Sequence, residues 1–514
     1  MPFLFGHASL SQIITNISEI IKNNKDDIIV QLLVLSIAYL GFKCRRIIGN
    51  IFLFLIKHLR KRSIRDYKVD ENGKKFIRLL NHNLKKFKIP RGVTSIDSWA
   101  FENCSSLSSV KIPSSVESIG VAAFRDCTSL TSVTIPSSVT SIGDKAFWGC
   151  SSLTSIEVDK NNPNYCSIDG VLFTKDQKTL IFCPLGKKAF SIPSGFTSIG
   201  DKAFWGCSSL SSVEIPPSVT SIGKGAFEGC SSLSSLVIPE GVTRIEDHTF
   251  RRCSSLMSLA IPSSVTSIGT GFGDSAFKDF SFLSSIKIPS SVTSIRFWGF
   301  GVMNSIGYRA FEGCSSLTKI EVAADNPNYC SIDGALFTKD KKTLLAYPAG
   351  RKGKYTLPDS VTGIGDGAFN GCSSLDSLEI PICLTDIGRN AFEGCSSLKS
   401  FEIPDCVSEI RYHTFFGCSF LKLIVIPDSV TEIGWNAFEG CSSLKLVYIP
   451  PSVTKIGDNA FKGCSSLSSL IISSSVTSIG AGAFYGCPNL TLKGPKGSYA
   501  EQYAKENGIK YVIY

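Results

Sequence analysis

The sequence predicts a solenoid of short strands stacked in coils of about 23 residues, and three observations carry this prediction. The stretch 135–158, IPSSVTSIGDKAFWGCSSLTSIEV, returns about every 23 residues from about residue 87 to the C-terminus. Its apolar positions fit neither one long helix nor one long strand. A Phe-x-x-Cys slot recurs in about fourteen of these units. Self-similarity at this period is typical of repeat architectures.

Each unit is best explained as a coil with several corners. Leu153, Ile156 and Val158 show the alternation of a short strand. Gly143 and Gly149 are expected where the backbone turns sharply. Because one coil cannot bury its own faces, we expect the coils to stack in register, with the repeated phenylalanines forming a column in the core.

The repeated pattern IPSSVTSIG-x-x-AF-x-GCSSL-x-x-I resembles the BspA-type leucine-rich-repeat family. The resemblance covers about residues 84–514. It implies a leucine-rich-repeat solenoid of about fourteen repeats. In many relatives the role is that of a cell-surface or secreted adhesin, so the resemblance also implies protein ligands, extracellular or host proteins among them.

The net charge of +10 is unevenly distributed along the chain. Residues 1–92 carry 18 Lys and Arg against 6 Asp and Glu, whereas the remaining residues carry 35 against 37. The repeats therefore hold no cationic excess of the kind that binds nucleic acid, and we expect no nucleic-acid partner.

Thirteen of the nineteen cysteines occupy the repeat slot, and the fourteenth slot holds Phe280. A position that also accepts Phe is an apolar packing position, where free Cys acts as a small hydrophobic residue. The alternatives are disulfide bonds and metal ligands. No CxxC pair occurs, which makes zinc the poorer alternative, and we expect neither metal nor cofactor.

Residues 1–65 form a hydrophobic and basic segment that we expect to be helical. Its uncharged runs, 28–42 and 47–56, are each shorter than the ~20 residues of a membrane-spanning helix. Three interpretations stay open: a signal-anchor, a basic helix pair lying on anionic lipid, or a helical cap on the first coil. If the segment spans a membrane, the cations after residue 56 place the repeats in the cytosol, opposite to the relatives.

We place the repeat solenoid at residues 66–490, with two hairpin inserts near 158–190 and 322–355. In the first, GVLFT and TLIFC flank the polar turn KDQK, and the second repeats the pattern. Each insert is either a structural clasp over the coil edge or a projecting ligand contact.

A third insert, residues 296–307, reads RFWGFGVMNSIG. It brings Phe297, Trp298 and Phe300 to an expected surface corner. Exposed aromatic residues favour a partner interface. The alternative is a loop folded back on the solenoid.

Residues 491–514 are expected to cap the last coil. Ser498 and Glu501 have the spacing of a capping box for a short helix, and Asn507-Gly508 suits its C-terminal end. Residues 511–514 are expected to add a last strand. No hydrophobic tail follows, so we expect no C-terminal anchor.

The outward strand positions vary most between repeats. Ser and Thr dominate them early, whereas charged residues and one tyrosine replace them in the last repeats. This change favours a protein-binding face. The alternative is a merely solvated exterior. The residues concerned are Asp376, Glu379, Lys399, Glu402, Lys422, Val425, Lys445 and Tyr448.

Nothing in the sequence favours catalysis. The five histidines fall in unrelated places, and neither an HExxH motif nor a Walker loop occurs. We therefore expect a non-enzymatic protein-binding protein at the cell surface or on a membrane, with an adhesin-like role. The alternative is an intracellular, cytoplasmic scaffold tethered to a membrane by its basic N-terminal segment.

Overall fold

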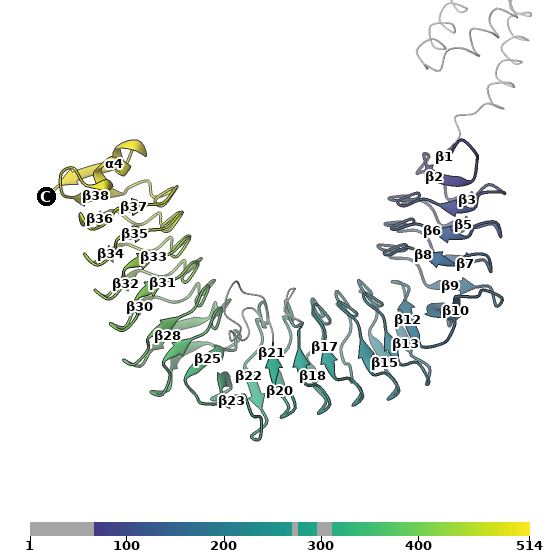
Figure 1. Cartoon of the computed structure of the whole chain (residues 1–514), viewed down its shortest axis with the longest axis horizontal. Coiled ribbons are helices and arrows are strands. Elements are labelled where there is room, and N and C mark those ends of the chain that lie inside the picture. Colours follow the sequence, from purple (N-terminus) through teal and green to yellow (C-terminus); the bar gives the residue numbers. More distant parts are fainter. Residues whose placement is uncertain (1–65, 270–275, 296–310) are drawn as a thin grey trace, which may run out of the picture. The chain divides into compact units, whose positions relative to one another are not determined.

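The computed structural model describes residues 66–269, 276–295 and 311–514. The chain divides into two units, 1–66 and 67–514, and the second holds nearly all the described residues. This second unit is a solenoid whose coils stack in chain order (Figure 1). The helical N-terminal segment expected at residues 1–65 lies outside the described residues.

Nearly every described coil contributes one strand of three to five residues to a series of parallel sheets along the stack, here together called the long-strand ladder; the coil at Val237 contributes only an isolated bridge to Ala260. The pairing is in register, since Phe87 faces Val110 and Val110 lies one repeat further along the chain. The strands of this ladder are β3 (Lys86–Lys88), β5 (Ser109–Lys111), β7 (Ser132–Ile135), β9 (Ser155–Val158), β13 (Ala189–Ser191), β15 (Ser212–Glu214), β18 (Ser258–Ala260), β20 (Ser285–Ile288), β22 (Lys319–Val322), β26 (Gly353–Thr356), β28 (Leu375–Glu379), β30 (Ser400–Glu402), β32 (Leu423–Val425), β34 (Leu446–Tyr448), β36 (Ser469–Ile471), β38 (Thr491–Gly494) and β39 (Lys510–Ile513).

A second parallel ladder, which the sequence analysis did not anticipate, is built from two-residue strands. In each strand the first side chain points outward and the second, usually Ile, points into the core. We call it the short-strand ladder. Its strands are β4 (Ser95–Ile96), β6 (Ser118–Ile119), β8 (Ser141–Ile142), β14 (Ser198–Ile199), β16 (Ser221–Ile222), β17 (Arg244–Ile245), β19 (Ser267–Ile268), β21 (Ser294–Ile295), β27 (Gly363–Ile364), β29 (Asp386–Ile387), β31 (Glu409–Ile410), β33 (Glu432–Ile433), β35 (Lys455–Ile456) and β37 (Ser478–Ile479).

Three antiparallel elements interrupt or open this pattern. A hairpin of β1 (Tyr67–Val69) and β2 (Lys75–Leu79) begins the solenoid, and β2 pairs in parallel with β4. The two inserts each form a three-stranded antiparallel meander whose last strand joins the short-strand ladder. Their strands are β10 (Tyr165–Ile168), β11 (Val171–Thr174), β12 (Thr179–Phe182), β23 (Tyr329–Ile332), β24 (Ala335–Thr338) and β25 (Thr343–Ala346).

The meanders contribute apolar side chains to the core. Val171, Phe173 and Leu180 are fully buried in the first insert, and Ala335, Phe337 and Leu344 in the second. These side chains have no exposed surface to offer a ligand. The packing is that of a structural clasp.

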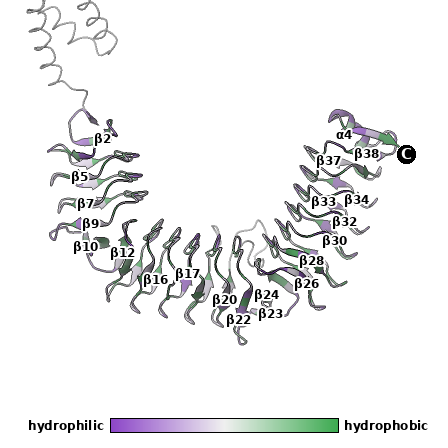
Figure 2. Ribbon diagram, turned by 180° about the vertical axis from the view of Figure 1, so that it is seen from behind, coloured by the Kyte–Doolittle hydropathy of each residue, from purple (hydrophilic) through white to green (hydrophobic). Residues whose placement is uncertain are grey.

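The repeated phenylalanines stack face to face through the core. Phe415, Phe438 and Phe461 have ring centroids 5.4 and 5.1 Å apart and interplanar angles of 2° and 12°. Figure 2 shows hydrophobic residues recurring in coil after coil along the stack. The column begins earlier than the Phe-x-x-Cys pattern, because Phe76 of the opening hairpin stacks on Phe101 at 4.8 Å.

The slot cysteines are free and, with one exception, buried. Each thiol that follows an uninterrupted coil also donates a hydrogen bond to the preceding coil. Cys150 Sγ, for example, lies 3.0 Å from the carbonyl oxygen of Phe124, and Cys441 Sγ lies 3.2 Å from that of Phe415. The prediction of a packing position is confirmed, and the thiol adds a hydrogen bond between coils.

The two glycines of the repeat unit serve different purposes. Gly149 has φ +73° and sits in a left-handed turn, as expected. Gly143 has no such φ, but it opens the expected turn, because its carbonyl oxygen accepts a hydrogen bond from the backbone N–H of Ala146 at 3.2 Å. A Cβ on Gly143 would lie 2.5 Å from the backbone nitrogen of Val121. Gly143 is therefore needed because adjacent coils approach closely at this point.

The C-terminal cap has the expected form. Helix α4 (Tyr499–Glu506) begins at Ser498, whose side chain accepts a hydrogen bond from the backbone N–H of Glu501. Tyr503 packs edge-on against Phe484, the last ring of the column, at 5.9 Å. Strand β39 then pairs in parallel with β38 and ends the sheet. The helix and the strand together cover the apolar end of the stack.

Candidate functional site

The outward side chains of the last long strands are the candidate site that the sequence proposed. Lys399, Glu402, Lys422, Lys445 and Tyr448 are all exposed and belong to neighbouring coils of the sheet that begins at β30. Asp376 and Glu379 lie on the preceding strand β28, and Val425 on β32. The structure therefore places these residues along one side of the stack.

Three apolar residues that the sequence analysis did not select lie among them. Leu423 faces Leu446 in the strand register, and Tyr448 faces Ile471. Leu446 is 63% exposed and Tyr448 is 54% exposed. Val425 completes two short rows of exposed apolar side chains on β32, β34 and β36. Contiguous exposed apolar surface of this kind marks interaction sites in soluble proteins.

The sequence did carry a signal for the missed leucines. Their position is occupied by serine in most other coils, for example Ser109, Ser132 and Ser400. Leu423 and Leu446 replace that serine in two consecutive coils. A comparison of this single outward position between repeats would have found them.

The three lysines form a row at the start of the same strands. The backbone N–H of Lys422 donates to the carbonyl oxygen of Lys399 at 2.9 Å, and that of Lys445 donates to Lys422 at 3.2 Å. Within the described part of the chain, none of the three ammonium groups has a carboxylate partner. Like charges on facing positions repel, so the row does not serve stability.

Earlier coils place a structural hydroxyl at the position of these lysines. Thr131 Oγ1 donates to the carbonyl oxygen of Ser108 at 3.4 Å, and Thr154 Oγ1 donates to that of Thr131 at 3.3 Å. These bonds tie one coil to the next. The lysine side chains make no such bond. The last coils therefore lack this side-chain hydrogen bond between coils and carry exposed positive charge at the position instead.

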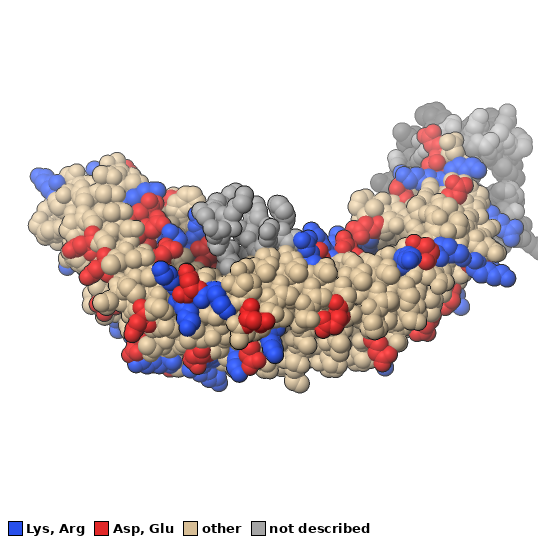
Figure 3. Space-filling model, turned by 60° about the horizontal axis from the view of Figure 1, so that its bottom comes forward, with Lys and Arg blue, Asp and Glu red and all other residues tan. Residues whose placement is uncertain are grey.

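The acidic residues differ in whether their carboxylates are already hydrogen-bonded within the protein. Lys354 and Thr356 both hydrogen-bond to Glu379, and these bonds lower the pKa of its carboxyl group. Glu379 is therefore engaged within its own sheet. At the other end of the strands, Asp405 and Asp428 are exposed on consecutive coils. Figure 3 shows acidic and basic side chains interspersed on the face in view, without a large area of one sign.

We name the exposed residues of these coils the C-terminal strip. It combines an apolar centre, a row of lysines at one end of the strands and aspartates at the other. It consists of Lys399, Glu402, Asp405, Lys422, Leu423, Val425, Asp428, Lys445, Leu446, Tyr448 and Ile471.

The aromatic insert cannot be compared with this strip. Phe297, Trp298 and Phe300 lie outside the described residues. Their role as a partner interface stays a prediction.

Catalytic and metal-binding chemistry finds little support in the described residues. Burial raises the pKa of Cys253 and of Cys314 to about 12, so these thiols stay protonated and inert. His248 and His413 occupy the same corner of separate coils, beside Arg251 and Asn390 respectively. Among the described residues, no group of His, Cys, Asp and Glu has the arrangement of a metal site.

The described residues also contain no helix that is both long enough and apolar enough to cross a bilayer. The membrane segment considered for residues 28–56 lies outside them.

Several solved structures resemble this chain. A leucine-rich cell surface protein from Faecalibacterium prausnitzii A2-165 is 28% identical, with 86% of this chain and 96% of that chain covered and a TM-score of 0.47. A leucine-rich repeat protein from Bacteroides ovatus is 28% identical over 88% and 99%, with a TM-score of 0.36. The pneumococcal vaccine antigen PcpA is 21% identical over 87% and 95%, with a TM-score of 0.44.

A search of the curated proteins found no match. The family model for the BspA type leucine-rich repeat region, which spans six copies of the repeat, does match. It aligns with residues 79–181, 177–304, 301–342, 352–467 and 442–493, which is most of the solenoid. The matched residues contain most of the Phe column and of the two strand ladders. The chain belongs to the BspA-type leucine-rich-repeat family.

Proposed function

We propose that this chain is a non-enzymatic repeat protein that binds a partner protein through the C-terminal strip. One observation carries the proposal. Positions that hold serine or threonine in most other coils are occupied here by Leu423, Leu446 and three lysines. Exposed leucines and unpaired lysines give the fold no stability, so recognition is the function they support.

The strip also indicates the chemistry of its partner. Tyr448 lies in the middle of the apolar rows, where buried tyrosines contribute most to binding energy. The lysine row favours a partner with acidic residues beside an apolar surface. Such charges speed association more than they strengthen the final complex.

A site-specific cross-link tests the proposal. A photo-reactive phenylalanine analogue replaces Leu446 in one protein and Ser132, its counterpart in an early coil, in the other. We expect a cross-linked partner protein only from position 446. The partner is identified by mass spectrometry and then purified for affinity measurements.

Paired variants then measure the contribution of the strip. Leu446→Asp with Tyr448→Asp should weaken binding of the purified partner at least about 10-fold, because both residues lie at the centre of the patch. Ser132→Asp with Thr134→Asp is the matched control and should leave affinity unchanged. Equal cross-linking from both positions, or a double strip variant that binds normally, would show that the strip is not the interface.

We further propose that the protein acts at the cell surface in an adhesin-like role. Membership of a family with many surface adhesins supports this placement. The alternative is an intracellular scaffold tethered by the N-terminal segment, which the excess of cations in residues 1–92 favours. Protease added to intact cells distinguishes the two: it removes the repeats from a surface protein and spares those of an intracellular scaffold.

A further inference from the structure

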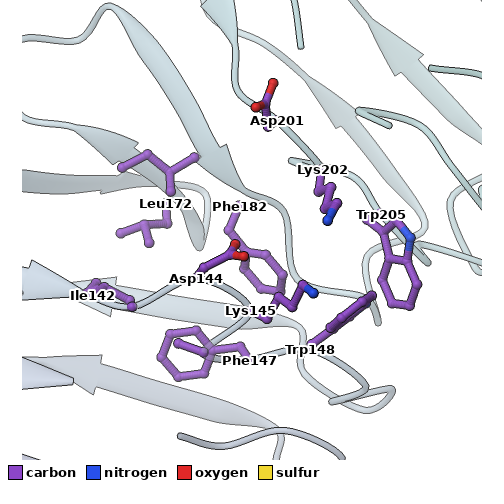
Figure 4. Close-up of a pocket in the computed structure, with 13 residues that line it drawn as sticks. Ile142, Asp144, Lys145, Phe147, Trp148, Leu172, Phe182, Asp201, Lys202 and Trp205 are labelled. Carbon is purple, nitrogen blue, oxygen red and sulfur yellow. The ribbon is translucent and has the colours of Figure 1, made fainter. Parts of the chain in front are cut away.

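A cavity of about 260 Å³ lies where the first insert interrupts the stack (Figure 4). Its two walls are corners of successive regular coils, residues 143–148 and 201–205. Both carry the sequence Asp-Lys-Ala-Phe-Trp, although 57 residues separate them. Leu172, Ile181 and Phe182 of the insert complete the lining.

Uninterrupted coils join their corners by backbone hydrogen bonds. The N–H groups of Ala122 and Phe124 donate to the carbonyl oxygens of Asp144 and Ala146, at 2.9 and 2.7 Å. The same bonds connect each corner to the next between residues 367 and 483. The N–H groups of a corner therefore point toward the following coil.

At the insert this ladder is broken, and the cavity occupies the break. The N–H groups of Lys145 and Phe147 have no acceptor among the described residues. The indole Nε1 of Trp148 is buried and also lacks a hydrogen-bond partner there. On the opposite wall, the carbonyl oxygen of Asp201 receives no donor from the described residues, whereas that of Ala203 accepts from Cys183 at 2.7 Å. One wall thus offers donors and the other an acceptor.

The side chains at the break are aromatic and balanced in charge. Lys145 Nζ lies 4.4 Å from the centre of the Trp148 ring, and Lys202 Nζ lies 5.7 Å from it. The ring centroids of Trp148 and Trp205 lie 3.9 Å apart, and the two rings meet edge to face. Asp144 and Asp201 also line the cavity (Figure 4). Two ammonium groups and two carboxylates favour a neutral polar ligand over a phosphate or a cation.

We propose that this cavity binds a short extended peptide segment of another protein, whose amide groups replace the missing corner. Its carbonyl groups accept hydrogen bonds from the Lys145 and Phe147 N–H groups. One of its N–H groups donates to the Asp201 carbonyl. The volume lies below the ~300–1,000 Å³ of sites for drug-sized ligands, which suits two or three residues. This inference does not depend on the C-terminal strip.

The test uses a peptide with the sequence of the corner itself. Acetyl-Gly-Asp-Lys-Ala-Phe-Trp-Gly-amide, labelled with fluorescein, is titrated with the full chain and followed by fluorescence anisotropy. We expect saturable binding. The same peptide N-methylated on every backbone amide should bind at least about 10-fold more weakly, because it has lost the N–H that donates to the Asp201 carbonyl and its methyl groups hinder the close approach of its carbonyl groups to the cavity wall.

Two variants place the binding at the cavity. Trp148→Phe replaces the indole that lines the cavity by a smaller ring, so it should weaken binding about 3–10-fold. Asp144→Trp, at an exposed position on the rim, should block the cavity and abolish binding. Trp435→Phe, an exposed tryptophan in a later coil, is the control and should bind as the original chain does. Circular dichroism and thermal melting verify that each variant folds.

Three results would overturn the proposal. The first is no anisotropy change of the labelled peptide up to about 1 mM of the full chain. The second is equal binding of the N-methylated peptide, or binding that Asp144→Trp leaves intact. The third is displacement of the peptide by glucose or by inorganic phosphate at comparable concentrations, which would identify a sugar or anion site instead.

Discussion

At the residue scale, each slot cysteine after Cys104 fills a small space in the core and donates a hydrogen bond from its thiol to the chain of the preceding coil. Cys418 Sγ lies 3.2 Å from the Phe392 carbonyl oxygen, and Cys464 Sγ lies 3.2 Å from that of Phe438. Alanine would fill less of the space and donate nothing. The repeat thus selects a residue that is both apolar and a weak donor. Phe280, which lacks a donor, shows that packing alone satisfies the position once.

The buried thiols make the solenoid sensitive to alkali. Burial raises the pKa of Cys253 and Cys314 to about 12, whereas an unfolded thiol ionises near ~8.5. Above that pH the unfolded chain has lost protons that the folded chain keeps, so the free energy of unfolding falls as pH rises toward 12. Each thiol contributes a loss of about 1.4 kcal/mol per pH unit in this window. Urea unfolding at pH 8 and pH 10 in a reducing buffer measures the loss.

A double variant isolates the thiol contribution. Cys253→Ala with Cys314→Ala removes two of these groups, so it should lose less stability between pH 8 and pH 10 than the original chain. Lysine and tyrosine titration is common to both proteins and cancels in the comparison. Identical losses would show that the thiols do not cause the alkaline sensitivity.

At the element scale, the phenylalanine column is the main contact between coils. Phe438 is fully buried between the rings of Phe415 and Phe461. Phe438→Ala should destabilise its coil by about 3–5 kcal/mol, because it leaves a cavity in a packed core. Hydrogen exchange of the amides between residues 415 and 461 measures this local loss. Tyr448→Ala, an exposed aromatic of the same coil, is the control and should cost no more than about 0.5 kcal/mol.

The sequence was sufficient to predict these repeated elements. The coil length, the long strands and the Phe column follow from a spacing that recurs many times, so each copy supports the others, whereas the terminal helix follows from its own capping residues Ser498 and Glu501. The short-strand ladder was missed because two residues are too few to show alternation. The opening hairpin was missed because its one core ring, Phe76, lacks the Cys that marks the later copies.

The candidate sites were less predictable for a related reason. Lys399, Lys422, Lys445 and Tyr448 stand out from their repeats and were selected from the sequence. Trp148 and Trp205 do stand out, because most other copies of their corner position hold a charged residue, but tryptophan at a repeat corner does not by itself indicate a cavity. What makes it a site is the pairing that the insert removes. Hydrogen bonds between coils are a property of the stack and leave no mark on a single repeat.

At the scale of the whole molecule, the regular coils share one sequence pattern and stack on their neighbours in the same way. Stability in such arrays is a sum over repeats and their interfaces. The first insert lies between two regular coils with the same corner sequence, so the coils on its two sides are matched to each other. The chain was interrupted there without a change in either flank. We therefore expect that deleting the insert restores direct stacking of the two coils.

Removing residues 159–192 should therefore give a folded, uninterrupted solenoid. The deletion takes out 34 residues and brings Pro136 and Pro193 from 57 to 23 positions apart, which is the normal repeat. Phe147 would then stack on Phe204, and the Lys145 and Phe147 N–H groups would reach the carbonyls of Asp201 and Ala203. Circular dichroism should show an unchanged β spectrum, and thermal unfolding should stay cooperative. The corner peptide should no longer bind, since its place is taken. A deletion variant that aggregates, or that melts in two separate steps, would show that the insert is required to join the two parts of the stack.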